Sequence, residues 1–394
     1  MTNTWIFIAI ISFVSFFEET LDLNSVMEEV CDNAVDDDND GLIDLNDPDC
    51  MCDTASIESI IPNASFENQI CCPNEMAQMS CAADWIQPSF GTSDYLHQCG
   101  YMYENIIDPA LSIFPDGQGA VGFLAGRNEP NGADLLEYIG ACLNRPLLQG
   151  NSYKLKFFVG FLTANFSPPF RIAVFGTDDC NNLPFTELGV DCPLEYSGWT
   201  RIGQLEVSSE GSVNVWLEFE LDLQLDMDIN AIVIGADCEF GVSQIRRLYL
   251  LDHLRLNDES NFDFELINQK HPCASDFRFE VEANPNFSFQ WYKEGIALIG
   301  ETGHQMSTMY GEGTYQLRLV NNLTQDCRTA TFPYSIPVAT SEIYELVCEG
   351  DSLMYQGDKL FEEGIYEYTF TSQEGCDSIV SLDIEIITDL SDSV

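Results

Sequence analysis

Positive charge is scarce in this chain of 394 residues. Lysine and arginine together number 15, against 65 aspartates and glutamates, so the formal net charge is −50 at pH 7. A surface of that sign repels phosphate backbones and anionic lipid headgroups, and we therefore exclude nucleic acid as a partner. Hydrophobic residues make up 45% of the chain and aromatic residues 12%, which is too much for a disordered chain. The acidic groups are therefore expected on folded domains.

The N-terminal apolar run is too short to span a membrane. It covers 13 residues, from Trp5 to Phe17, whereas a membrane-spanning helix requires roughly 20. We interpret residues 1–22 as a signal peptide, although no Lys or Arg precedes the run and no A-x-A cleavage site follows it. A buried N-terminal helix or strand is the alternative. The signal-peptide interpretation predicts a secreted or cell-surface protein with no membrane span in the mature chain.

Signatures of catalysis are also missing. The sequence contains no G-x-S-x-G, H-E-x-x-H or P-loop motif and no E-x-D-x-x-E strand signature. Its 4 histidines leave little for Ser-His or Cys-His chemistry. A glycosidase would need two opposed carboxylates in a cleft, and no compact motif supplies them. We therefore expect that the protein is not an enzyme.

Cysteines, in contrast, are numerous. All 15 lie after the apolar run, and a reducing cytosol would give so many thiols no purpose, so they support export. Zinc would need closely spaced cysteine pairs combined with one another or with histidines, and the sequence offers only Cys50 with Cys52 and the doublet Cys71-Cys72, with scattered histidines. Short separations predict these disulfides: Cys31 with Cys50, Cys72 or Cys71 with Cys81, Cys180 with Cys192, and Cys348 with Cys376.

An odd number of cysteines leaves at least one thiol unpaired or intermolecular. Cys238 lies in the apolar stretch AIVIGADCEF, so we take it as the candidate for a buried free cysteine. The partners of Cys52, Cys99 and Cys142 stay open.

From about residue 55 to 258 the pattern is typical of β-strands. Runs of β-branched and aromatic residues recur at regular intervals between Gly, Pro, Asn and Asp, and helical periodicity of any length is missing. In VNVWLEFEL, alternate residues from Val213 to Leu221 are apolar, while the other face has Asn214, Trp216, Glu218 and Glu220. This alternation indicates a half-buried antiparallel strand. About 200 residues of such strands are expected to form a two-sheet sandwich.

After Asn257 the pattern changes. Residues 262–340 contain Cys273, Trp291, a Gly-x-Tyr at Tyr315 and Cys327, which is typical of an immunoglobulin-type sandwich with a Cys273–Cys327 disulfide near Trp291. Residues 341–388 repeat the scheme in shorter form, and residues 389–394 form a polar tail. A modular array is therefore expected.

The sharpest motif lies between Cys31 and Cys50. Counted from Asp36, acidic residues fall at positions 1, 3, 5, 9 and 12 of a calcium-binding loop, with Gly41 at position 6 and a backbone carbonyl at position 7. Oxygen ligands at this spacing select a hard cation such as calcium; the alternative is an acidic spacer without metal. The predicted ligands are Asp36, Asp38, Asp40, Leu42 through its carbonyl, Asp44 and Asp47.

The segment D-x-D-x-D-G-x-x-D resembles the calcium repeats of thrombospondin type 3. The stretches ADWIQPSFGTSDYLHQCG, GQGAVGFLAGRN and YLLDHLRL, with the flanking Asp-rich and G-x-Y segments, resemble secreted surface proteins of gliding, polymer-degrading marine bacteria. That resemblance implies an all-β chain: a calcium-binding segment at 23–52, a galactose-binding-like jelly roll at 53–258, and Ig-like modules at 262–340 and 341–388. Many members of that group end in a secretion sorting domain, which is not evident here.

The resemblance also implies a second calcium position. Jelly rolls of that type often bury a structural calcium between the first and last strands, and the matching positions are Glu67 and Asp252. Each interrupts an apolar strand, where an unpaired charge is costly. A salt bridge with Arg246 or Arg247, and plain exposure, are the alternatives.

For function, we expect a calcium-dependent binding or adhesion protein that recognises a polysaccharide or glycoprotein through the jelly roll. Sugars are held by aromatic faces together with polar side chains. The alternatives are a structural spacer that binds nothing, in which every Trp should be buried, and an accessory part of a polysaccharide hydrolase. The candidate ligand-binding residues lie in loop-like sequence: Trp85, Asp94, Tyr95, Tyr101 and Tyr103.

Overall fold

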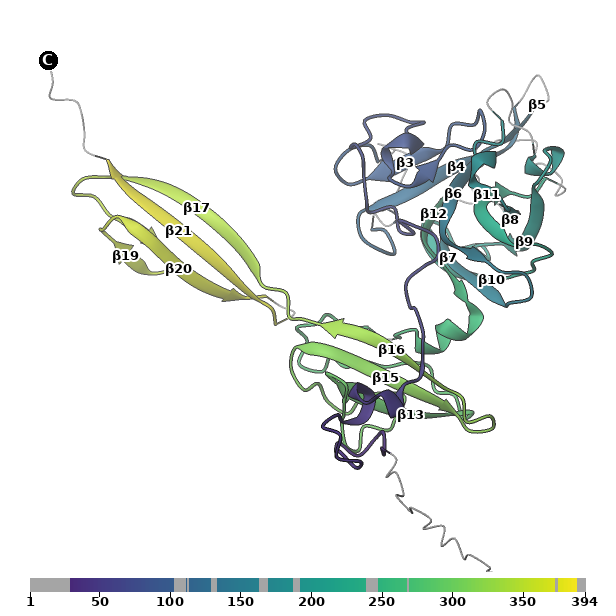
Figure 1. Ribbon diagram of the computed structural model, residues 1–394. Coiled ribbons are helices and arrows are strands. Elements are labelled where there is room, and N and C mark those ends of the chain that lie inside the picture. The colour runs from purple at the N-terminus through teal and green to yellow at the C-terminus, as the bar shows by residue number, and fades with distance from the viewer. Residues whose placement is uncertain are drawn as a thin grey trace, which may run out of the picture.

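The computed structural model describes three β-rich bodies (Figure 1). It covers residues 29–102, 111, 113–128, 133–162, 169–186, 192–238, 247–267, 269–372 and 375–387. The expected signal peptide and the C-terminal tail lie outside the described residues. None of the helices described is long and apolar enough to cross a membrane.

The largest body is a sandwich of two antiparallel sheets, as expected for a jelly roll. One sheet has the order β10 (Val215–Leu223), β7 (Tyr153–Phe161), β12 (Arg247–Asp258), β4 (Gly119–Asn128) and β3 (Asp94–His97), with β5 (Ala133–Leu136) beside β4. The other has the order β2 (Trp85–Ile86), β6 (Tyr138–Leu147), β11 (Ile229–Ala236), β8 (Phe170–Thr177) and β9 (Thr200–Val207). Short 3-10 turns η3 (Met79–Cys81), η4 (Cys180–Asn182) and η5 (Pro193–Glu195) lie in its loops.

Alternation along the strands decides which side chains enter the core between the sheets. In β10, Leu217 and Phe219 pack against this core, while Glu218 and Glu220 are exposed, which confirms the face predicted from the sequence. Successive residues of a strand point to opposite faces, so in β12 Leu251 enters the main core and Leu250 joins a second cluster. The second cluster also contains Leu96, Leu111, Phe114, Ala120, Leu162 and Leu248, with Trp216 packed against it.

The second body is an Ig-like sheet with the order β1 (Asp53–Thr54), β16 (Cys327–Tyr334), β15 (Gly313–Asn321), β13 (Phe287–Lys293) and β14 (Ile296–Ala297). Trp291 is fully buried and stacks on Phe279 at a centroid distance of 6.1 Å. Tyr315 of the Gly-x-Tyr is also fully buried, and its hydroxyl donates to the Gly311 carbonyl. Trp291 and Tyr315, the two aromatic residues that indicated an immunoglobulin-type sandwich, therefore lie in the core of this body.

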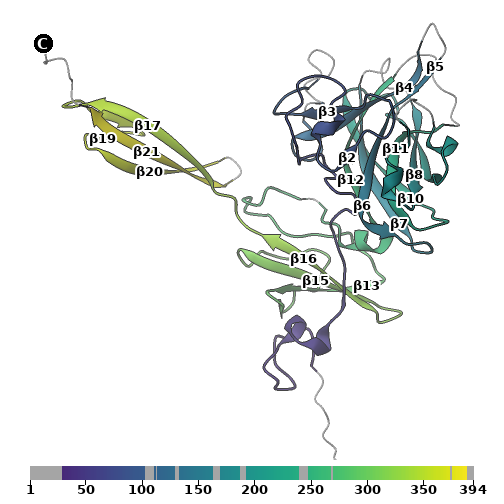
Figure 2. The ribbon, with the colours of Figure 1, turned by 45° about the horizontal axis from the view of Figure 1, so that its top comes forward.

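The Asp-rich segment belongs to this second body, although the sandwich separates the two in sequence. β1 pairs in parallel with β16, and Ala55 lies in the Ig-like core. The segment, with its turns η1 (Asp44–Asn46) and η2 (Pro48–Cys50), lies at the β14 edge of the sheet, where η1 contacts β14. Figures 1 and 2 both show the segment, in purple, beside the Ig-like sheet at the lower end of the molecule. The boundary expected before residue 53 therefore falls after Ala55, and the sandwich is an insertion within one Ig-like unit. A 3-10 turn, η6 (Glu259–Phe264), leads back from the sandwich.

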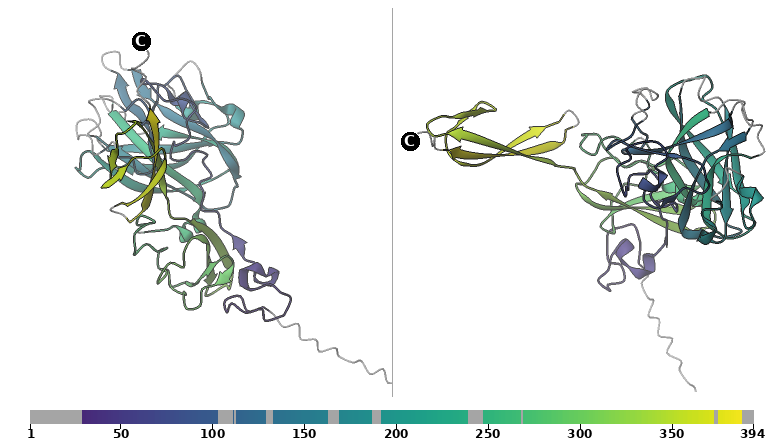
Figure 3. Two further views of the ribbon diagram at one scale, coloured as in Figure 1. Left: turned by 90° about the vertical axis from the view of Figure 1, so that its left-hand side faces the viewer. Right: turned by 90° about the horizontal axis from the view of Figure 1, so that it is seen from above.

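The third body is a small sheet that extends away from the other two (Figure 3). β17 (Ala339–Cys348) pairs in parallel with β21 (Asp377–Ile387), β20 (Gly364–Thr371) pairs with β21 on the other side, and β18 (Leu353–Tyr355) pairs with β19 (Asp358–Leu360). Its core has four buried residues: Val347, Leu360, Leu382 and Ile384.

Of the predicted disulfides, only Cys31–Cys50 is confirmed as stated. Cys81 bonds to Cys71, the alternative left open, and Cys72 bonds to Cys99 instead. The remaining pairs join positions that lie far apart in sequence, which short separations cannot reveal. They are Cys142–Cys180, Cys192–Cys238, Cys52–Cys327 and Cys273–Cys376.

These pairs correct four expectations. Cys180–Cys192, Cys273–Cys327 and Cys348–Cys376 do not form, and Cys238 is not a free cysteine. The free thiol is Cys348, at the exposed end of β17. No disulfide crosses the core of the Ig-like unit in the described residues, and Trp291 packs against aromatic rings instead.

Candidate functional site

The Asp-rich segment gathers its carboxylates into two overlapping groups. Oxygens of Asp36, Asp38 and Asp40 lie within 4.8 Å of one another, and so do oxygens of Glu29, Asp38 and Asp47. Calcium binds oxygen at 2.3–2.6 Å, so two ligand oxygens on opposite sides of one ion are about 4.6–5.2 Å apart. The spacing of both groups therefore suits a calcium ion, and Asp38 belongs to both.

Local backbone hydrogen bonds shape the first group. Asp36 Oδ2 accepts from the Gly41 N–H at 3.0 Å, and Gly41 has φ +94°, a left-handed conformation that favours glycine. Asp38 and Asp40 each accept from the N–H two residues on, at 3.0 and 2.7 Å. These turns curl the loop so that the three carboxylates converge. The glycine predicted at position 6 thus has the sharp turn that a calcium loop requires.

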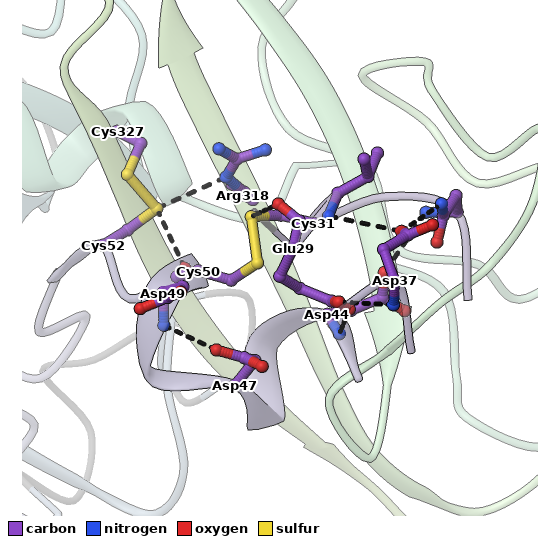
Figure 4. The surroundings of a disulfide bond; sticks show 12 residues. Glu29, Cys31, Asp37, Asp44, Asp47, Asp49, Cys50, Cys52, Arg318 and Cys327 are labelled. Carbon is purple, nitrogen blue, oxygen red and sulfur yellow. Dashed lines mark hydrogen bonds between the residues drawn. A yellow bond between two sulfur atoms is a disulfide. The ribbon is translucent and has the colours of Figure 1, made fainter. Parts of the chain in front are cut away.

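Two carboxylate oxygens in this segment are buried and have no hydrogen-bond partner among the described residues: Asp36 Oδ1 and Asp47 Oδ2. Asp47 is 2% exposed, and its other oxygen accepts from the Asp49 N–H at 2.7 Å (Figure 4). One orphaned oxygen lies in each of the two groups. Burying a charged oxygen without a partner is costly, so these positions call for a cation.

Mutual repulsion among the acids is visible at Asp38. The hydrogen bond from the Asp40 N–H lowers the pKa of Asp38, but desolvation and the charges of Asp40, Asp47 and Asp36 outweigh it, so the pKa is raised overall. A bound cation would lower the pKa of Asp38, because it favours the charged carboxylate.

Asp44, predicted as a metal ligand, has a different environment. It is fully buried, and its Oδ1 accepts from the N–H groups of Asn33 and Ala34, each at 3.2 Å. Its Oδ2 accepts from the Ala297 N–H of β14 at 2.8 Å. Asp44 thus fastens the Asp-rich segment to the Ig-like sheet rather than facing the other carboxylates.

Glu29 is a site residue that the spacing did not reveal. It is 5% exposed, and its two oxygens accept from the N–H groups of Asp37 and Asp44 at 2.8 and 3.0 Å (Figure 4). Glu29 precedes the loop and lies outside the counted positions. Its acidic side chain just before Cys31 was the one available signal.

Further contacts hold the segment on the Ig-like sheet. The Leu45 N–H donates to the Gly295 carbonyl at 3.1 Å, and the Tyr292 hydroxyl donates to the Cys31 carbonyl at 2.7 Å. The Cys52–Cys327 disulfide closes the attachment, and Arg318 Nε donates to Cys52 Sγ at 3.3 Å (Figure 4). The acidic groups are therefore built onto a folded platform.

The second predicted pair, Glu67 and Asp252, has a different character. Asp252 is fully buried, which raises its pKa to about 8 even though the N–H groups of Asp116 and His253 donate to it. Glu67 is exposed and accepts from the N–H groups of Gln118 and Gly119. Among the described residues, all the donors to both carboxylates are backbone groups.

The alternatives for Asp252 can be compared directly. Plain exposure is excluded, and no lysine or arginine pairs with Asp252 in the part of the chain that is described. Arg246 and the side chain of Arg247 lie outside the described residues. His253 follows Asp252 in the chain, and its Nδ1 lies 3.2 Å from Asp116 Oδ2. Calcium at Glu67 and Asp252 stays a prediction.

The predicted ligand-binding residues do not form an aromatic platform. Trp85 is 4% exposed, stacks near Phe66 and donates through Nε1 to the Asn63 carbonyl. Tyr95 is fully buried and Asp94 is 4% exposed. Tyr101 packs half-buried against the second cluster of the sandwich, and Tyr103 lies outside the described residues. Trp85, Tyr95 and Tyr101 therefore pack within the sandwich, and Asp94 accepts from the Ala77 N–H at 2.5 Å.

Comparisons with known proteins give limited likenesses. No family model and no curated protein matches the chain. Among solved structures, the K1 cleaved adhesin domain of Lys-gingipain from Porphyromonas gingivalis W83 matches with 15% identity and TM-score 0.28, over 50% of this chain and 96% of that one. A Stig cyclase from Fischerella sp. TAU matches with 14% identity and TM-score 0.32, over 51% and 96%.

A third match is the C-terminal CBM6 module of a marine laminarinase from Zobellia galactanivorans. It has 11% identity and TM-score 0.23, over 42% of this chain and 99% of that one. Scores this low carry no argument, so the proposals below rest on this chain's own residues.

Proposed function

We propose that this protein is an extracellular, calcium-dependent binding or adhesion protein whose Asp-rich segment takes up calcium. The observation that carries the calcium assignment is the pair of buried oxygens without partners, Asp36 Oδ1 and Asp47 Oδ2, within converging carboxylates. Calcium is a hard cation that prefers several oxygen ligands in a flexible arrangement. The residues that would hold it are Glu29, Asp36, Asp38, Asp40 and Asp47.

Calcium would act mainly on the stability of the Ig-like unit. Without a cation the carboxylates repel one another, and the whole chain carries a net charge of −50. Cation binding to the folded segment but not to the unfolded chain adds stability by mass action. Asp44 and the Cys52–Cys327 disulfide join the segment to the sheet. Calcium binding to the segment would therefore stabilise the entire Ig-like unit.

The extracellular assignment is supported by covalent chemistry. Seven disulfides use 14 of the 15 cysteines, and such bonds persist in oxidising compartments. The apolar run from Trp5 to Phe17 supports export as a signal peptide. Calcium is abundant in those surroundings.

A structural spacer is the second candidate, and one observation favours it. In the sandwich, Trp85 and Trp199 are at most 8% exposed, and Trp216 is half-buried against Phe114. A sugar platform built on a tryptophan of the sandwich would need an accessible ring among these. Carbohydrate recognition, if it is the function, therefore uses other residues of the chain. We expect no turnover of any glycan.

A glycan array on the full chain, produced with its disulfides oxidised, tests the binding proposal. The array is probed in calcium, in magnesium and in chelator. Binding to polysaccharides in calcium that weakens in chelator supports a calcium-dependent binding protein. Silence on every glycan together with a calcium-dependent melting temperature would favour the spacer. Released sugars would contradict the non-enzymatic assignment.

A further inference from the structure

One edge of the third body is a long strand that is open to solvent. β17 pairs with β21 on one side, and none of the described strands pairs with its other side (Figure 3). The strand has 10 residues, of which only Val347 is buried. A free edge presents a row of unpaired backbone N–H and C=O groups, which a further strand can satisfy.

Features that commonly protect edge strands are missing from β17. Proteins shield such edges with proline, with lysine, with a bulge or by keeping the strand short. β17 contains neither proline nor lysine. Its register with β21 continues without a shift from Ala339 to Cys348. The edge is therefore long and regular enough to accept another strand.

Two large apolar side chains are exposed along this edge. Tyr344 and Leu346 are 56% and 53% exposed. Because alternate residues of a strand point to opposite faces, both lie on the face away from Val347, which belongs to the small core. A strand added beside β17 would cover part of both side chains, and the burial of apolar surface would favour docking.

The charge around these side chains is negative. Glu342 and Glu345 of β17 are exposed. Asp383 and Glu385 of β21 are exposed on the same face as the two apolar side chains. Lys359 is the only lysine or arginine from residue 339 to 387. Opposite charges on neighbouring strands stabilise a sheet and like charges destabilise it, so a strand that pairs with β17 is expected to carry lysine or arginine.

We propose that β17 binds an extended, basic segment of another protein, which pairs with it as a further strand of the sheet. Backbone hydrogen bonds would supply affinity, and alternate side chains would supply specificity. A second copy of this chain fits poorly, because it would bring the same glutamates together and each copy has a net charge of −50. The inference goes beyond the function proposed above, since this edge contains none of the calcium-binding residues.

The test uses the full chain in calcium, at about 150 mM salt, with three synthetic peptides of equal length. One alternates lysine and valine, one alternates glutamate and valine, and one alternates lysine and proline. The lysine–proline peptide has the charge of the first but lacks the N–H groups that a strand needs. Calorimetry measures affinity, and amide hydrogen exchange locates the peptide. Only the lysine–valine peptide should bind and slow exchange between Ala339 and Cys348.

Charge reversal of the edge gives a second readout. The double variant Glu342→Lys, Glu345→Lys should bind the lysine–valine peptide roughly tenfold more weakly and should bind the glutamate–valine peptide instead. The double variant Glu362→Lys, Glu363→Lys is the matched control, because both glutamates are exposed, lie in the same body and are not part of β17. It changes the net charge equally and should bind as wild type does. Melting temperatures show that both variants are folded.

Several results would overturn the inference without affecting the calcium proposal. Equal affinity for the lysine–valine and lysine–proline peptides would mean that charge alone attracts them. Binding without slower exchange in β17 would mean that the peptide docks elsewhere, and no binding of any peptide would remove the basic partner. Exchange in β17 that slows with protein concentration alone, together with dimers in sedimentation, would assign the edge to a second copy. An edge variant that still preferred lysine–valine would contradict the charge argument.

Discussion

Replacing Asp44 by asparagine separates a structural role from a metal-binding one. Asp44 is fully buried and accepts three backbone N–H groups, at 3.2, 3.2 and 2.8 Å. Its φ of +49° is a conformation that asparagine tolerates well, so Asp44→Asn changes the hydrogen bonds and the charge while leaving the backbone unstrained. The amide keeps one acceptor oxygen and presents an NH₂ to a backbone donor.

The magnitude follows from the lost contacts. Hydrogen bonds to charged groups contribute about 1.5–3 kcal/mol each, and at least one is lost while the rest become neutral. We expect Asp44→Asn to lower the free energy of unfolding of the Ig-like unit by about 2–4 kcal/mol. For a unit of this size that corresponds to roughly 10 °C or more in melting temperature. Because the effect is structural, it should be present in chelator.

Scanning calorimetry of the full chain in chelator and in calcium measures this. Asp40→Asn is the control, since Asp40 is exposed and lies in the same loop. That variant should melt almost like wild type in chelator and lose part of the stabilisation by calcium. If Asp44→Asn instead melted like wild type in chelator and lost its response to calcium, Asp44 would be the ligand that its spacing predicts, and our assignment would be refuted.

Three further predictions concern other parts of the chain. Burial raises the folded-state pKa of Asp252 to about 8, above its unfolded value of about 3.9. In chelator, the contribution of Asp252 to the free energy of unfolding should therefore be greatest below pH 4 and should fall as the pH rises toward 8. In Asp252→Asn, the free energy of unfolding should depend less on pH over this range. The double variant Cys52→Ser, Cys327→Ser should detach the Asp-rich segment, so limited proteolysis should cut it faster and calcium affinity should fall; unchanged cleavage would argue against the docking. Cys348 should react with a maleimide in the native protein, and peptide mapping that placed the label elsewhere would contradict the free-thiol assignment.

Alternation and composition were sufficient to predict much of the architecture. The inward face of β10 and the glycine turn at Gly41 both depend on neighbours within a few residues. Features that depend on neighbouring residues can be predicted from the order of residues along the chain. The all-β class follows from the same patterns.

The attachment of the Asp-rich segment could not be predicted in this way. β1 has two residues, and its pairing with β16 joins positions separated by the whole sandwich. Likewise, the spacing of the acidic residues predicts Asp44 and Asp47 equally as ligands. In the structure, Asp44 accepts three N–H groups, whereas Asp47 keeps one oxygen without a partner among the described residues. Only the folded backbone decides which carboxylate remains available. The same reason explains why short separations failed for most disulfides.

The central claim is that the Asp-rich segment binds calcium through the two groups that share Asp38. The most direct measurement is a calorimetric calcium titration of the full chain, its Asp38→Asn variant and Asp49→Asn, a control whose exposed acid lies outside both groups. We predict saturable binding to wild type and to Asp49→Asn, and its loss from Asp38→Asn, with both variants folded. Identical isotherms for all three proteins, or no heat with wild type, would contradict the account.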